Sequence, residues 1–177
     1  AYLYIPYPDM EKELAILRKK LPHVDDRLAA QVALTAFIPM LMGTGGNSGS
    51  QSSVTVIRSL SLDEVQFSDM FRIWWKEIRV AVLCGLTLAA ANFFKLLFFD
   101  LRSYSGAGDP IQIALVVSLT LVGTIVMAKI VGSSLPLLAS KIGFDPAVMA
   151  SPFITTLVDA IALVTYFKLA TVLLHIA

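Results

Sequence analysis

A single carboxylate lies inside the last apolar stretch of the sequence. Asp159 is the only charged residue in 146–167, and a lone carboxylate among apolar residues is costly unless it faces a cavity, a partner or an ion. Helical spacing places Ser151, Thr155 and Asp159 on one face, with Thr156 beside them. Mg²⁺ often binds through one or two carboxylates and keeps several of its waters. The pattern therefore predicts a site for a hydrated divalent cation.

Two nearby features bear on how Asp159 is satisfied. Pro152 has no N–H to bond the carbonyl of Val148, so we expect a carbonyl to turn outward and add an oxygen ligand. The alternative is an ion pair with a basic side chain. Lys129 is available from another apolar stretch, and Lys168 lies on roughly the same face, about 13 Å along the helix.

The first apolar stretch, residues 28–57, also contains polar residues and glycines. Pro39 removes a helical hydrogen-bond donor, and Gly43 follows four residues later. Irregular backbone at bilayer depth occurs where it meets protein or water, and broken helices bind ions there. The stretch thus predicts a break, and the alternative is close helix packing through Gly45 and Gly49. The residues behind this prediction are Gly45, Gly46, Asn47, Ser48, Gly49, Ser50, Gln51, Ser52 and Ser53.

Other site chemistries find little support in the sequence. The glycine-rich segment 43–49 lacks the Gly-Lys-Ser/Thr ending of a phosphate-binding loop. The two histidines, His23 and His175, lie near opposite ends of the chain, and Cys84 is the only cysteine. The serines of the first apolar stretch, residues 28–57, have no histidine near them in the sequence that could act as a general base. The formal net charge of +1 gives no field that would attract nucleic acid. We therefore expect neither an enzyme nor a nucleic-acid partner.

The composition indicates that the elements holding these residues cross a lipid bilayer. Hydrophobic residues make up 56% of the 177 residues and charged residues 15%, against about 25% charged in soluble domains. A spanning helix needs about 20 mostly apolar residues. We expect an all-α, polytopic membrane helical bundle in which residues 1–24 form a cytosolic-side amphipathic segment and residues 25–177 the transmembrane domain. Four spans are predicted, at 28–57, 78–99, 110–138 and 146–176.

The distribution of basic residues indicates that one further span is missing. Basic residues gather both before residue 28 and in 58–79. Both groups should prefer the cytoplasm, yet a single span between them would put them on opposite sides. Either the first apolar stretch re-enters the membrane, or a span is absent between about residues 22 and 26, and we favour an absent span. Trp74 and Trp75 fit an aromatic belt at the membrane interface.

Two long segments resemble a known family. Residues 37–60, FIPMLMGTGGNSGSQSSVTVIRSL, resemble the signature of the MgtE family of magnesium channels, and residues 145–167, DPAVMASPFITTLVDAIALVTYF, resemble its last transmembrane helix. The resemblance covers residues 28–175 and keeps the two segments in the family's order.

The resemblance implies a homodimeric channel in a cell membrane, with its pore on the two-fold axis and lined by the first and last visible spans. It assigns the pore carboxylate to Asp159 and a backbone carbonyl ligand to Thr155. Mg²⁺ is the expected ion, with Mn²⁺ and Ca²⁺ left open. Gly45, Gly46 and Asn47 correspond to a pore-lining bend, and the predicted pore lining also includes Ser151, Pro152 and Thr156.

The chain also departs from the family's pattern. Members have five spans, and the missing first one would fall near residues 24 and 25, where the charge distribution requires it. Members usually carry cytosolic sensor domains as well, so we expect weakened magnesium-dependent closure in a form without them. Two alternatives remain open: an ion-coupled secondary transporter that uses the broken helix, and a non-conducting assembly subunit.

Overall fold

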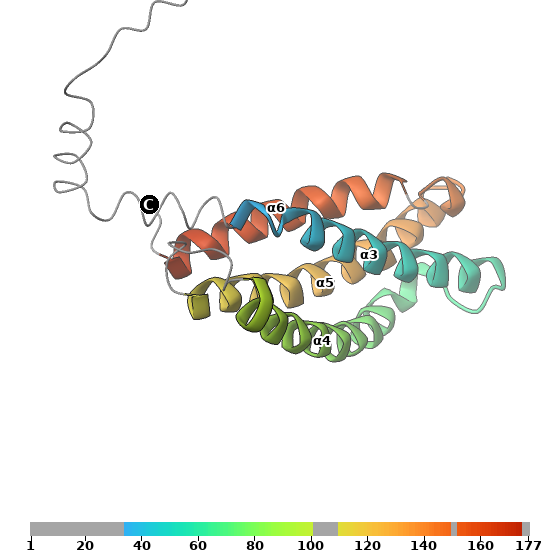
Figure 1. Ribbon diagram of the computed structural model, residues 1–177. Coiled ribbons are helices and arrows are strands. Elements are labelled where there is room, and N and C mark those ends of the chain that lie inside the picture. The colour runs from blue at the N-terminus through green and yellow to red at the C-terminus, as the bar shows by residue number, and fades with distance from the viewer. Residues whose placement is uncertain (1–33, 101–109, 150–151, 175–177) are drawn as a thin grey trace, which may run out of the picture.

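The computed structural model describes residues 34–100, 110–149 and 152–174, and these are helical, with no strand among them. This confirms the predicted all-α fold. The elements are α3 (Ile38–Ser61), a 3₁₀ turn η1 (Phe67–Asp69), α4 (Met70–Lys95), a π-helical turn η2 (Leu96–Asp100), α5 (Pro110–Lys141), a 3₁₀ turn η3 (Pro146–Met149) and α6 (Pro152–Leu174), as Figure 1 shows.

Helix α5 is the centre of the bundle. It packs against α3, α4 and α6, and α3 also packs against α6. Figure 1 shows α3 and α6 together on one side of α5 and α4 on the other. In the most apolar window of each helix, 56% of the residues are buried in α5, against 28% in α4 and 22% in α6. Because α5 is apolar all round, it suits this central place.

The buried apolar residues form two clusters. The larger one joins α3, α4, α5 and α6, and within it the Tyr166 hydroxyl donates a hydrogen bond of 2.7 Å to the carbonyl of Leu34. The smaller cluster joins α5 and α6 through Ala128, Ile154 and Val158. These contacts fix α6 along α5 and therefore fix the position of Asp159.

Three of the helical segments are long and apolar enough to cross a membrane. They are Phe67–Phe99, Ile111–Lys141 and Pro152–Leu173, counted over the described residues. Their outward side chains are apolar: Leu83 of α4 is 69% exposed and Val172 of α6 is 68% exposed. Water would not favour this surface, but lipid tails would. Three of the predicted spans are therefore confirmed, although the helices around the second and fourth begin at Met70 and Pro152.

The predicted break in the first span does not fall at the glycines but before them, because helical residues 34–35 are followed by a turn at 36–37, after which α3 begins. Helix α3 runs without interruption from Ile38 to Ser61, through Gly45, Gly46 and Asn47. Pro39 lies in the first turn of this helix, where its missing N–H removes no intrahelical bond. Residues 1–33, which include the amphipathic segment and the expected missing span, lie outside the described residues.

The α3 glycines allow close helix packing, the alternative to a break. A Cβ atom on Gly132 of α5 would lie 2.9 Å from the Cα of Gly49. A Cβ on Gly45 would lie 2.7 Å from Cγ2 of Thr124 and 3.0 Å from Cγ1 of Val158. Real side chains do not tolerate such distances, so the backbones of α3 and α5 are in contact at Gly49 and Gly132, and at Gly45 side chains of α5 and α6 pack directly on the α3 backbone.

Candidate functional site

A small hollow of about 120 Å³, lined by both polar and apolar residues, opens between α3 and α6. Asn47 in its wall is exposed, and Thr155 and Asp159 are half-buried, so the hollow opens to the outside of the chain. Four residues predicted from the sequence, Gly46, Asn47, Thr155 and Asp159, therefore meet in one place. The lining is Met42, Gly43, Gly46, Asn47, Thr155 and Asp159.

Gly46 brings the α6 carboxylate close to the backbone of α3. A Cβ atom at this position would lie 3.2 Å from Cγ2 of Thr155 and 3.7 Å from Oδ1 of Asp159. Since the real residue has no Cβ, the Asp159 carboxylate and the Thr155 side chain both approach α3 directly. Asp159 and Asn47 bring carboxylate and amide oxygens to the hollow, the ligands that a hard cation prefers. Met42 and the Thr155 methyl group that faces Gly46, by contrast, are apolar.

Asp159 has no basic partner among the described residues. Lys129 binds Glu77 instead, at 3.0 Å, and Lys168 is exposed and forms no ion pair there. Both ion-pair alternatives are therefore wrong over this part of the chain. No three His, Cys, Asp or Glu side chains converge as a metal site in the described residues either. A cation at Asp159 would meet one carboxylate per chain and otherwise neutral oxygen atoms.

The Val148 carbonyl, which we predicted to turn outward because of Pro152, lies close to residues outside the described ranges, and its orientation stays a prediction. Pro152 begins α6 and does not lie within it, because a separate 3₁₀ turn, Pro146–Met149, precedes the helix. At the start of a helix the missing N–H of proline disrupts no bond. The carbonyl of Pro152 accepts two hydroxyl hydrogen bonds, from Thr155 at 3.0 Å and from Thr156 at 2.9 Å.

The remaining predicted site residues lie apart from the hollow. Gly45 faces α5 and the Val158 side of α6, where it serves helix packing. Thr156 is exposed on α6, and neither it nor Pro152 lines the hollow. Ser151 lies outside the described residues. Their place in a pore lining stays a prediction.

The structure contains a buried polar cluster that the sequence analysis missed. Lys129 of α5 donates to Oε2 of Glu77 at 3.0 Å, and the hydroxyl of Ser52 on α3 donates to the same oxygen at 2.7 Å. The Glu77 and Lys129 side chains are 8% and 11% exposed. Three helices thus meet at one carboxylate. The sequence offered one signal, namely Lys129 at the end of a long charge-free run, but not the identity of its partner.

Fold and site together define a class of protein: a multi-pass helical membrane protein with a carboxylate-bearing hollow between two of its helices. Comparison with known families makes the assignment specific. The profile of the MgtE family, described as "Divalent cation transporter", matches residues 38–169. The chain belongs to the MgtE family, which confirms the resemblance drawn from residues 37–60 and 145–167.

Three curated relatives match most of the chain, each named "Magnesium transporter MgtE". The protein of Thermus thermophilus is 37% identical over 148 residues, which is 84% of this chain and 31% of the relative. That of Bacillus subtilis is 31% identical over 155 residues, 88% of this chain and 33% of the relative. That of Enterococcus faecalis is 29% identical over 142 residues, 80% and 30% respectively.

The chain spans about a third of the length of these relatives. The matched segment contains all of α3, α4 and α5 and most of α6. The family consists of transporters, which agrees with the expectation that the chain is not an enzyme. The match therefore includes the helices that form the Asp159 hollow.

Proposed function

We propose that this chain forms the membrane part of a channel that conducts Mg²⁺, with the ion passing along a path lined by α3 and α6. One observation carries the proposal: the Asp159 carboxylate lines an open hollow and has no basic partner among the described residues. A carboxylate at this depth in a membrane helix needs a cation or water to be stable. The magnesium-transporter names of the relatives support Mg²⁺ as the cation.

The hollow suits a cation that keeps its water. Mg²⁺ loses water reluctantly, and Asp159 offers one charged ligand, with Asn47 and the Thr155 carbonyl as neutral ones. A single carboxylate per chain attracts the ion without trapping it, as conduction requires. Mn²⁺ and Ca²⁺ meet the same oxygen ligands, so discrimination among the three depends on how firmly each keeps its waters.

A second copy of the chain would complete the pathway. The hollow opens outward from the four helices, and the lipid side of a bilayer cannot solvate Asp159. Two copies related by a two-fold axis, with their Asp159 side chains facing, would enclose a water-filled path between them. In this arrangement the end of the bundle that carries Arg58, Arg72, Lys76 and Lys141 faces the cytoplasm.

The test is a comparison of Asp159→Asn and Asp159→Glu with Asp145→Asn in proteoliposomes. A divalent ion about 5 Å from a unit charge gains about 1.7 kcal/mol even at the dielectric constant of water. Asp159→Asn should therefore lower Mg²⁺ flux at low Mg²⁺ by at least about tenfold. Asp159→Glu should retain part of the flux. Asp145 is an exposed loop residue that caps the amide of Ala147, so Asp145→Asn serves as the matched control and should leave flux unchanged.

Flux is measured with a Mg²⁺-sensitive dye inside the vesicles, and repeated with Mn²⁺ and Ca²⁺. Unchanged Mg²⁺ flux and selectivity in Asp159→Asn would remove this residue from the pathway. An imposed pH gradient distinguishes a channel from a proton-coupled transporter, because only the transporter would be driven by it. The transporter alternative relied on a broken helix, and α3 is continuous.

A further inference from the structure

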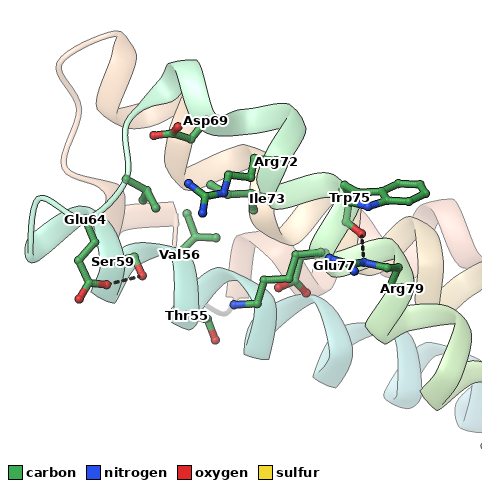
Figure 2. Close-up of a pocket in the computed structure, with 12 residues that line it drawn as sticks. Thr55, Val56, Ser59, Glu64, Asp69, Arg72, Ile73, Trp75, Glu77 and Arg79 are labelled. Atoms are coloured by element: carbon green, nitrogen blue, oxygen red, sulfur yellow. Dashed lines mark hydrogen bonds between the residues drawn. The ribbon is translucent and has the colours of Figure 1, made fainter.

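A second and larger hollow lies away from Asp159, between the C-terminal half of α3 and the first turns of α4. Its volume is about 610 Å³. Arg72, Lys76 and Arg79 line it from α4. Their spacing of four and three residues places them on one face of the helix. Figure 2 shows Arg72 extending from α4 above Val56 of α3, and Arg79 beside the backbone of Trp75.

None of these three basic side chains is neutralised by a carboxylate within 4.0 Å in the described residues, where Lys129–Glu77 is the ion pair found. Arg79 interacts with Trp75 twice: its Nε donates to the carbonyl at 3.3 Å, and its guanidinium carbon lies 5.7 Å from the ring centroid. The positive charge of Arg72 and Lys76 is therefore available to an anion in the hollow.

Three acidic residues, Glu64, Asp69 and Glu77, also line the hollow, and among the described residues none of them lies within 4.0 Å of its three basic side chains. Glu77 is bound by Lys129 and by Ser52. Glu64 accepts a hydrogen bond of 3.2 Å from Ser59, and Asp69 accepts one of 2.9 Å from the amide of Gln66. Both of these donors are neutral, so Glu64 and Asp69 keep their charge at the start of α4. Because Lys129 neutralises Glu77, the positive charges of the three basic side chains prevail further along the α4 wall.

The surface beside the hollow is apolar and faces outward. Trp75 is 64% exposed and Phe71 is 73% exposed, and further along α4 Leu83 is 69% exposed. Tryptophan at a helix end of this kind is typical of the membrane interface. A ligand seated here would meet basic groups at one end and lipid-facing apolar side chains at the other.

We propose that this hollow binds the headgroup of an anionic phospholipid, with Arg72, Lys76 and Arg79 around the phosphate and the acyl chains along the outer face of α4. Arg and Lys near a membrane surface attract anionic lipids in this way. A free phosphate compound would meet the same basic groups, but it would make no use of the apolar surface of Phe71, Trp75 and Leu83. The membrane itself therefore supplies the ligand.

The experiment measures binding of phosphatidylglycerol to the purified full chain in neutral detergent by native mass spectrometry. The test variant is Arg72→Gln/Lys76→Gln. The matched control, Arg58→Gln/Lys141→Gln, removes two positive charges at the same end of the bundle, from residues that do not line the hollow. We expect the test variant to bind roughly 30-fold more weakly, from the loss of two basic residues near an anionic headgroup, and the control to bind like the unmodified chain.

Two further arms keep the proposal testable. Arg72→Lys/Lys76→Arg preserves both charges and should restore binding, which separates loss of charge from loss of folding. Glycerol 3-phosphate at the same concentration should not displace the lipid. Equal lipid binding by the test and control variants would overturn the proposal, as would displacement by glycerol 3-phosphate, which would assign the hollow to a soluble phosphate.

Discussion

The buried ion pair between Glu77 and Lys129 makes a quantitative prediction about how α4 is held to α5. Both side chains are nearly inaccessible, at 8% and 11% exposed. Removing one partner leaves the other charge buried without compensation, which costs about 3–5 kcal/mol. Glu77→Gln keeps an oxygen that accepts the hydrogen bond from Ser52, and Lys129→Met keeps the apolar part of the side chain. We expect each single substitution to lower the free energy of unfolding by about 3 kcal/mol.

The double variant distinguishes a true pair from two separate contributions. With both charges absent, no buried charge remains uncompensated, so Glu77→Gln/Lys129→Met should lose less stability than either single variant. The free energy of unfolding is measured by titrating sodium dodecyl sulfate into mixed micelles and following circular dichroism. Lys168→Met, an exposed lysine on α6, is the control and should leave stability unchanged. If the losses of the two single variants simply add in the double variant, the two charges do not stabilise the bundle as a pair.

The same unfolding titration tests two other contacts. Gly132→Ala should cost about 1–3 kcal/mol, because its methyl group would lie 2.9 Å from the Cα of Gly49. Gly123→Ala, whose methyl group would meet only a threonine methyl at 3.9 Å, should be neutral or stabilising by up to about 1 kcal/mol; equal effects of the two would contradict close backbone packing. Trp74→Phe should cost about 1 kcal/mol, because the indole N–H donates to a serine hydroxyl of α5 at 2.8 Å. Trp75→Phe should lower the free energy of unfolding by less than Trp74→Phe does. A larger loss for Trp75→Phe would refute the role given to the Trp74 hydrogen bond.

The sequence predicted the apolar helices well because their signal is local. Residues 110–138 have no charge before Lys129 and form one helix, Pro110–Lys141. The first span was predicted less well because glycines in an apolar stretch can indicate either a break in a helix or close packing of a helix against a neighbour. Gly45, Gly46 and Gly49 break a helix that stands alone, but they favour one whose backbone contacts a neighbour. Only the presence of α5 and α6 against α3 decides between the two.

The site was predicted in part for the same reason. Asp159 and Thr155 share a helix face by spacing alone, and the structure brings both to one hollow. Pro152 was misread because the boundary of α6 depends on the 3₁₀ turn that precedes it. Glu77 was missed because a glutamate among basic residues at the start of a helix looks solvent-exposed. Its burial becomes evident only when Lys129, fifty-two residues further on, is placed beside it.

By itself the sequence determined that the chain is an all-α membrane protein. It also singled out Asp159 as a charged residue inside an apolar stretch, where a charge needs an explanation. These conclusions depend on hydropathy and on helical spacing, which are properties of neighbouring residues. The tertiary structure alone decided that α3 is continuous, that Lys129 belongs to Glu77, and that Asp159 is left facing a hollow. Each of these depends on which helices lie in contact, and the energy of a buried charge is set by the partner across the interface, not by its neighbours in the chain.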